Sequence, residues 1–248
     1  MEPPKVIKTI TDFIAKETQK RNSMGVVVGL SGGLDSSVAA TLAVRAIGRR
    51  CVFALILPDS NITPKSDIYD AERLAKCIGA RYRIIDIGAM KKSIIGTLPR
   101  NKMAQGNFVS RLRMSILYYY AAVMHRLVLG TTDKSELRLG YYTKHGDSAA
   151  DIFPIADLYK TDVRELARHL QIPSVILEKK SSPRLWRTQT AEGEIGLSYE
   201  EVDHILRRLD ANAVYESKLN PKYLQRIKAL IENNKHKHEL PPICKINN

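Results

Sequence analysis

The sequence predicts an α/β fold, a Rossmann-like doubly wound parallel sheet flanked by helices, with C-terminal helices and a mobile lid loop. Three observations favour this class. The first half alternates short apolar runs with segments of helical periodicity. The runs are nearly uninterrupted, which is typical of parallel strands buried on both faces. A glycine-rich segment joins the first apolar run to the next helix. This segment lies at the carboxyl end of a predicted parallel strand, where ligands bind in folds of this class.

The first half is predicted to supply the whole sheet. Lys5–Lys20 carries an apolar stripe at helical spacing and is expected to form the first helix. Short apolar runs predict the strands, at Met24–Leu30, Cys51–Leu57, Tyr82–Ile87 and Arg126–Leu129. Helical periodicity predicts the helices between them, at Ser36–Ile47, Ser66–Ile78 and Asn107–His125. Since crossover helices return the chain in the same direction, the strands are expected to be parallel.

The second half is predicted to be less regular. Thr131–Lys160 is polar and carries several glycines, which indicates irregular structure, and Thr161–Leu170 has helical spacing. The segment at about 179–196 has no periodic pattern, and a long loop of this kind in a compact domain usually serves as a lid. Ser198–Glu201 is a capping box that opens a helix reaching Leu209.

The C-terminal part is expected to complete a single domain over residues 1–248. Pro221 opens a last helix that reaches about Asn233, because proline suits the first helical position. A basic tail follows at about 234–248. We find no internal repeat that would divide the chain further.

Composition and charge exclude several classes of protein. The chain has 39 Lys and Arg but 26 Asp and Glu, so its formal net charge of +13 predicts an anionic partner. Its three cysteines form no Cys-x-x-Cys pair, which argues against a disulfide framework and a cysteine zinc site and favours a reduced, cytoplasmic setting. No apolar run approaches the ~20 residues that a membrane helix needs, so no membrane partner is expected.

The segment Gly29–Ser36, Gly-Leu-Ser-Gly-Gly-Leu-Asp-Ser, follows a predicted strand and opens a predicted helix. Its glycines let backbone amides approach an anion, and the helix N-terminus adds its dipole and free N–H groups. Asp35 would repel a phosphate unless a cation lay between them, so Asp35 is expected to hold Mg²⁺. The segment is neither a Walker A loop nor Gly-x-Gly-x-x-Gly. It therefore predicts a phosphate site of another type.

This segment resembles the pyrophosphate loop of the ATP pyrophosphatase families, which split ATP between its α and β phosphates. Further segments resemble those of ammonia-dependent NAD synthetases, in the order of that family, and the resemblance covers residues 29–242. These segments are Gly106–Met114, Gly130–Glu136, Leu139–Pro154, Asp157–Thr161, Glu192–Gly196, His236–Lys237 and Pro241–Pro242.

The resemblance implies a ligase that amidates deamido-NAD. AMP from ATP would be transferred to the nicotinate carboxylate with release of pyrophosphate, and ammonia would attack the acyl-adenylate to give NAD and AMP. The implied partners are ATP, deamido-NAD, ammonia and a second copy of the chain in a homodimer that uses the long helix. Glutamine is not expected to supply nitrogen, because a chain of 248 residues leaves no room for a glutaminase domain.

The resemblance also implies roles for individual residues. Asp35 and Glu136 would hold Mg²⁺. ATP would contact Gly29, Leu30, Ser31, Gly32, Gly33, Leu34, Asp35, Ser36, Thr131, Lys160 and Ser182. Deamido-NAD would contact Arg111, Lys144, Asp151, His236 and Lys237. Lys160, Asp147 and Glu194 are the expected catalytic residues, and Lys160 would neutralise charge that develops on pyrophosphate. Arg113, two residues beyond Arg111, is interpreted as structural.

Two departures from the family pattern concern the lid. Ala191 stands where the family has Asp, and Ser181–Leu185 differs from the family's Pro-[Ser/Thr]-Ala-x-Leu. Two alternatives stay open: another pyrophosphate-loop adenylating enzyme, such as one that modifies tRNA, and a basic nucleic-acid-binding protein. Residues 81–146 carry 12 Lys and Arg against 3 Asp and Glu, without an aromatic-interleaved RNA motif. This favours small polyphosphate substrates and no nucleic acid.

Overall fold

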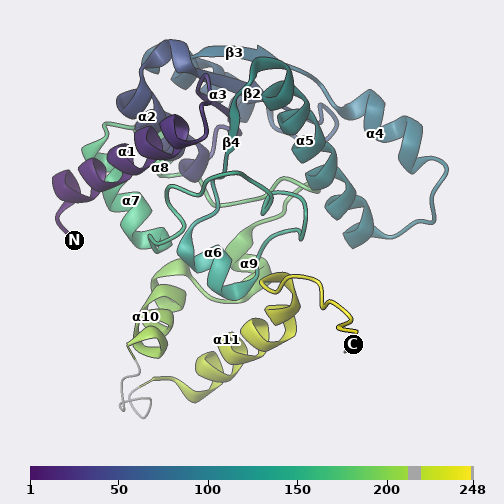
Figure 1. Cartoon of the computed structure of the whole chain (residues 1–248). Coiled ribbons are helices and arrows are strands. Elements are labelled where there is room, and N and C mark those ends of the chain that lie inside the picture. Colours follow the sequence, from purple (N-terminus) through teal and green to yellow (C-terminus); the bar gives the residue numbers. More distant parts are fainter. Residues whose placement is uncertain (212–218, 247–248) are drawn as a thin grey trace.

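A four-stranded parallel sheet forms the centre of the computed structural model, which describes residues 1–211 and 219–246 (Figure 1). The strands are β1 (Val26–Gly29), β2 (Val52–Ile56), β3 (Arg81–Ile84) and β4 (Leu127–Leu129), in the order β3-β2-β1-β4. All three strand pairs are parallel, and Val26 pairs with both Val52 and Leu127. The order reverses between β1 and β4, and a reversal of this kind opens a crevice at the carboxyl ends of the strands.

Helices cover both faces of this sheet, so the predicted doubly wound architecture is confirmed. One face packs against α1 (Pro3–Lys20), α2 (Leu34–Ile47), α3 (Lys65–Ile78), α7 (Lys160–His169) and α8 (Ser174–Leu177). The other packs against α5 (Lys102–Met124), with α4 (Gly88–Ile95) beside it (Figure 1). Val26 and Val28 point into the first core and Val27 into the second, and all three are fully buried. This two-sided burial explains the uninterrupted apolar run.

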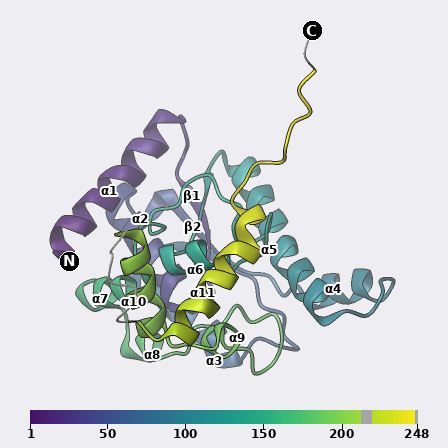
Figure 2. The same ribbon diagram turned by 90° about the horizontal axis from the view of Figure 1, so that it is seen from below.

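A smaller helical layer lies beyond the carboxyl end of β4. It contains α6 (Lys134–Leu139), α9 (Ala191–Ile195), α10 (Tyr199–Asp210) and α11 (Pro221–Asn234), and the 3₁₀ turn Lys235–Lys237 follows. Leu139, Ile195, Leu206 and Ile227 form its buried core. Figure 2 shows the C-terminal residues leaving this layer as an extended segment. The layer lies below the sheet in Figure 1.

Several segments differ from the predictions, which included neither α4 nor α8 and began α5 at Asn107 where the structure begins it at Lys102. The interpretation of Thr131–Lys160 as irregular is wrong at α6, and the loop predicted at about 179–196 contains α9. These helices of six and five residues are too short to show periodicity, and each depends on a side-chain cap, Asp133 for α6 and Thr190 for α9. The tail predicted from 234 begins only after the 3₁₀ turn. Within the described residues, none of the helices is long and apolar enough to cross a membrane.

Candidate functional site

The phosphate loop is the tight connection between the end of β1 and the start of α2. Ser31 and Ser36 shape it from within, because their hydroxyl oxygens lie 3.0 Å apart. Ser31 Oγ accepts from the amide of Gly33, and Ser36 Oγ accepts from the amide of Ser31. Gly33 is the N-cap of α2 and makes no side-chain cap. The first turn of α2 can therefore offer its amides to an anion.

Gly32 allows this loop to lie against α3. Its φ is +75°, and a Cβ built there would lie 2.2 Å from the backbone oxygen of Asp67. The loop therefore needs glycine at this position both for its backbone conformation and for the close approach of α3.

We expect Gly32→Ala to lower ATP affinity by at least about tenfold and the free energy of unfolding by about 1–2 kcal/mol, the cost of a left-handed L-residue. Gly48→Ala is the matched control, because Gly48 has φ +80° but nothing within 4 Å of its Cβ position. The control shares the backbone strain without the clash, so it should lose less stability than Gly32→Ala and keep ATP affinity, as measured by denaturant unfolding and calorimetry. Equal losses of ATP affinity in both variants would contradict a specific role for the loop.

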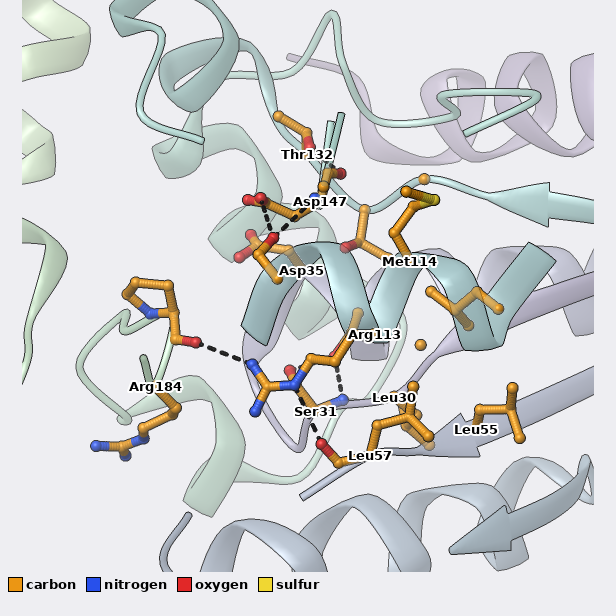
Figure 3. A pocket seen from close by; sticks show the side chains of 18 of the residues that line it. Leu30, Ser31, Asp35, Leu55, Leu57, Arg113, Met114, Thr132, Asp147 and Arg184 are labelled. Carbon is orange, nitrogen blue, oxygen red and sulfur yellow. Dashed lines mark hydrogen bonds between the residues drawn. The ribbon is translucent and has the colours of Figure 1, made fainter. Parts of the chain in front are cut away.

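A cavity of about 240 Å³ opens where β1, β2 and β4 end, between the phosphate loop, α5 and the segment after α8 (Figure 3). One wall is apolar and comes from Leu30, Leu55, Leu57, Met114, Leu117 and Leu129. The opposite wall is polar and holds Asp35, Thr131, Glu136 and Asp147. An apolar slot beside a phosphate loop suits a nucleotide, whose base is flat and whose phosphates are charged.

A second, smaller cavity adjoins the phosphate loop. It is lined by Ser31–Asp35 and Asp67, and by the basic side chains of Lys160, Arg164, Lys179, Lys180 and Arg184. Several cations around helix N-terminal amides suit a polyphosphate. The two cavities share Ser31, Asp35, Ser181, Ser182 and Arg184. A nucleoside triphosphate can therefore place its base in the first cavity and its distal phosphates in the second.

Lys160 is the centre of a buried charge cluster between these cavities. Its Nζ atom lies 2.8 Å from Asp35 Oδ2, Asp133 Oδ2 and Glu136 Oε1, and the side chain is 1% exposed. Burial alone would lower the pKa of Lys160, but attraction by the three carboxylates outweighs it and raises that pKa well above its ordinary value. Burial likewise raises the pKa of Glu136. Lys160 is therefore an ammonium that lines the second cavity and lies against Asp35, which lines both.

The geometry and the charge of this cluster fit a divalent cation. The ligand atoms of Asp35, Asp133 and Glu136 all lie within 4.8 Å of one another. Three carboxylates against one ammonium leave an excess of negative charge in a buried place, which is costly without a further cation. Asp35 Oδ1 is buried and has no hydrogen-bond partner among the described residues. Hard oxygen ligands of this kind suit Mg²⁺ beside phosphates.

Asp133 is the member of the cluster that sequence reasoning missed. Its Oδ1 atom accepts from the amide of Glu136 and so caps α6, while Oδ2 pairs with Lys160. Burial raises the pKa of Asp133 to about 6. The sequence signal for Asp133 was an acidic residue three positions before Glu136, where it could cap a helix. This signal was missed because no helix was predicted in the segment.

The residues predicted to bind the dinucleotide meet at one place, with one exception. Arg111 Nε and Nη2 donate to the backbone oxygen of Lys144, at 3.2 and 3.1 Å. Lys144 Nζ donates to the backbone oxygen of His236. Lys237 Nζ donates to the backbone oxygens of Gly140 and Tyr142. The structure thus joins α5, the loop after α6 and the C-terminal 3₁₀ turn in one basic group.

Asp151 lies apart from this basic group. Its Oδ2 atom accepts from the amide of Val128 in β4, and its charge helps raise the pKa of Tyr118 after the larger effect of burial. Tyr118 is seven residues from Arg111, which places it about 10 Å along the same side of α5. A long ligand that follows α5 can reach both places.

Asp147 and Glu194 occupy different positions relative to the cavity. Asp147 lines it, and its Oδ1 atom accepts from Ser110 Oγ at 2.7 Å and the amide of Thr143 at 2.9 Å. Glu194 lies behind Tyr141, whose hydroxyl donates to Glu194 Oε2 at 2.5 Å. Tyr141 lines the cavity, and burial raises its pKa. Sequence reasoning missed Tyr141, because nothing in its motif distinguishes a cavity tyrosine from a core one.

Thr131 and Ser182, the two residues outside the loop and Lys160 that were predicted to contact ATP, line the cavity, and Ser182 does so from the segment after α8. Arg113, interpreted as structural, also lines it and fastens that segment, because Arg113 Nε donates to the backbone oxygen of Leu57 and Nη1 to that of Pro183. Burial lowers the pKa of Arg113. Ala191 is fully buried and starts α9, so no charged group occupies that place.

Three ion pairs hold the same segment to α3. Lys179 Nζ lies 2.9 Å from Asp67 Oδ1 and 2.6 Å from Asp70 Oδ2, and it also donates to the backbone oxygen of Gly32. Arg184 Nε lies 2.8 Å from Asp67 Oδ2. The segment predicted to be a lid is thus tied to the phosphate loop itself. Its movement would be coupled to whatever that loop binds.

Comparison with known proteins gives concordant matches. The NAD synthase family matches residues 6–241. A protein of Archaeoglobus fulgidus named NH(3)-dependent NAD(+) synthetase is 43% identical over 243 residues, which cover 98% of this chain and 97% of that protein. The solved structure of NMN synthetase from Francisella tularensis has a TM-score of 0.91 at 34% identity and covers 99% of this chain and 100% of that one. The NH3-dependent NAD synthetase from Campylobacter jejuni, in complex with nitrate, has a TM-score of 0.87 at 34% identity with the same coverage.

Proposed function

The chain belongs to the NAD synthase family, and from that membership we infer that it catalyses the ATP-dependent amidation of deamido-NAD by ammonia. The products are NAD, AMP and pyrophosphate. The observation in the structure that best supports this reaction is the buried Lys160–carboxylate cluster, which lies between an apolar nucleotide cavity and a basic polyphosphate cavity.

The first half-reaction is the transfer of AMP to the nicotinate carboxylate. A carboxylate oxygen attacks the α-phosphorus of ATP, a new P–O bond forms, and the bond to the β-phosphate breaks. The negative charge that gathers on pyrophosphate would lie beside Lys160 and the amides at the start of α2. Such fixed positive groups stabilise a transition state without reorganisation. Thr131 and Ser182 would contact ATP from the two sides of the cavity.

We place Mg²⁺ on Asp35 and Glu136, with Asp133 as a third carboxylate within reach. When bound, the ion would neutralise the phosphate oxygens of ATP as a Lewis acid. The residues of the chain contribute the rest. Lys160 keeps the three carboxylates from repelling one another, and the phosphate loop orients the triphosphate.

The second half-reaction replaces AMP by ammonia. The nitrogen lone pair attacks the acyl carbon, the C–O bond to AMP breaks, and the nitrogen loses a proton. Asp147 is the carboxylate that can take this proton, because it lines the cavity and is oriented by Ser110 and Thr143. Glu194 would act through Tyr141, which would hold the segment after α8 against the cavity. Exclusion of water protects the acyl-adenylate from hydrolysis.

Deamido-NAD would lie along α5, from Arg111, Lys144, His236 and Lys237 toward Asp151. Arg111, Lys144 and His236 are joined in one basic group, which would bind one end of the ligand. Arg111 shares a face of α5 with Tyr118, which interacts with Asp151. Arg111 is exposed and presents a planar fork that suits phosphate or carboxylate oxygens.

Arg111→Ala should raise the KM for deamido-NAD by about tenfold, the effect of losing one charge-assisted contact. The KM for ATP should stay within about twofold, because Arg111 lines neither of the two cavities described above. Arg126→Ala is the control, because Arg126 also donates to a backbone oxygen, that of Arg50, but lies just before β4 at the opposite edge of the sheet. If both variants raise the two KM values alike, Arg111 does not bind the dinucleotide.

We also propose a homodimer that uses α4 and α5, and a cytoplasmic location. Large apolar side chains are exposed along these helices and their connection, at Met90, Ile94, Leu98, Met103, Tyr119 and Val123. Several exposed large apolar side chains on neighbouring elements are typical of a contact surface. Sedimentation equilibrium should give a mass near twice the 27.9 kDa of the chain. The cytoplasmic location rests on the three free cysteines, which suit a reducing compartment.

The proposed function is tested by supplying ATP, Mg²⁺, ammonium and deamido-NAD and measuring NAD and AMP. We expect equal amounts of both, and no NAD when glutamine replaces ammonium. Nicotinate mononucleotide is the second acceptor to test, because one solved relative is described as NMN synthetase. If AMP forms with neither acceptor, adenylation is contradicted. If only nicotinate mononucleotide is turned over, the acceptor is the mononucleotide and not deamido-NAD.

A further inference from the structure

One face of α10 lies against the first turn of α7, where Lys160 is the first residue (Figure 1). Tyr199, Asp203 and Arg207 recur at four-residue spacing and so share this face. Lys160 Nζ lies 5.0 Å from the centre of the Tyr199 ring, Asp203 Oδ2 accepts from the amide of Thr161, and Arg207 pairs with Asp162. The face thus contacts three successive residues of α7.

Asp203 connects this face to the helix that carries Glu136. Its Oδ1 atom accepts from Ser135 Oγ at 2.5 Å, and Ser135 Oγ in turn accepts from the amide of Lys160 at 2.9 Å. Asp203 is 1% exposed and Ser135 is fully buried. One carboxylate from α10 therefore holds α6 and α7 together at the position of the charge cluster.

We propose that Asp203 is a positioning residue for the adenylation step, an inference that rests on the function proposed above. Asp203 lines neither of the two cavities described above, so it acts through Ser135 and the backbone of Lys160 and Thr161. Lys160 Nζ keeps three contacts of 2.8 Å at once, and a shift of its backbone changes all of them. A misplacement near 1 Å at a reacting group can cost about 100-fold in rate.

The experiment compares Asp203→Ala with Asp162→Ala. Asp162 lies in the same turn of α7 and makes two polar contacts, to Arg207 and to the amide of Tyr159, neither of which reaches α6. We expect Asp203→Ala to lower kcat by about 30-fold and to leave both KM values within about threefold. Asp162→Ala should lose thermal stability but keep kcat within about threefold. Asp203→Asn keeps an acceptor for the amide of Thr161 and should fold even if the alanine variant does not. Its kcat should lie between those of Asp203→Ala and Asp162→Ala.

The coupling to Ser135 provides a second test. If Asp203 and Ser135 act as one chain of contacts, the double variant Ser135→Ala/Asp203→Ala should have about the kcat of the more impaired single variant. The inference is overturned if the two effects multiply, if Asp162→Ala loses kcat equally, or if the KM values rise instead. Hydrogen exchange of the Lys160 and Thr161 amides should accelerate in Asp203→Ala. A wild-type chain that makes no NAD would contradict the proposed function, whereas unchanged exchange would contradict the positioning contact.

Discussion

Asp35→Asn is expected to lower turnover by about 100- to 1,000-fold while the chain stays folded, the range seen when one charge-stabilising group is removed from an active site. Asparagine keeps the shape of the side chain but removes one negative charge and one oxygen ligand. Asp35 Oδ1 is buried and has no hydrogen-bond partner among the described residues, so it is free to bind an ion. Mn²⁺ binding, followed by its electron paramagnetic resonance signal, should weaken in parallel with turnover.

Asp59→Asn is the matched control for this variant. Asp59 is also buried, also pairs with a lysine, Lys91 at 2.7 Å, and also follows the carboxyl end of a strand. It lies outside the Lys160 cluster, so Mn²⁺ binding should be unchanged and turnover should stay within about threefold. Retention of Mn²⁺ binding and turnover in Asp35→Asn would refute the metal assignment.

Lys160→Met should have the second large effect, a loss of turnover by at least about 100-fold together with about 3–5 kcal/mol of unfolding free energy. Methionine retains much of the aliphatic volume but leaves three buried carboxylates facing one another without their ammonium. Because Mg²⁺ would then supply the missing positive charge, it should raise the thermal midpoint of this variant more than that of the wild type.

Lys91→Met removes the comparable Asp59–Lys91 pair and serves as the control. It should lose stability but gain nothing extra from Mg²⁺, and it should keep its turnover within about threefold. An equal Mg²⁺ effect on the thermal midpoints of both variants would show that Lys160 does not belong to the ion site.

Sequence reasoning predicted the parts of this molecule that local patterns determine. Val26–Val28 are buried from both faces of the sheet, and a run of β-branched residues shows that directly. Gly32 and Asp35 belong to one segment of eight consecutive residues, Gly29–Ser36, so the chemistry of the phosphate loop could be interpreted without tertiary structure. Helices α6 and α9 could not be predicted, because they have only six and five residues and depend on single caps.

The parts of the site that sequence reasoning missed depend on contacts between distant segments. Asp203 acts on Lys160 from 43 residues away, and Arg113 reaches Pro183 from the other side of the cavity. Asp151 was grouped with Arg111 through the family resemblance, and its hydrogen bond from the amide of Val128 in β4 could not be seen in the sequence. Spacing along one helix or loop is visible in a sequence, whereas the packing of α5 and α10 against the sheet is not.

The proposed reaction requires that an acyl-adenylate forms in the cavity between the phosphate loop and α5. Deamido-NAD labelled with ¹⁸O in both oxygens of its nicotinate carboxylate tests it most directly. If a carboxylate oxygen attacks the α-phosphorus of ATP, one labelled oxygen must leave with AMP and the other must remain in the amide of NAD. Mass spectrometry should therefore find one ¹⁸O in AMP for every NAD formed. AMP without label, formed together with NAD, would contradict the acyl-adenylate and the roles assigned to Lys160 and the phosphate loop.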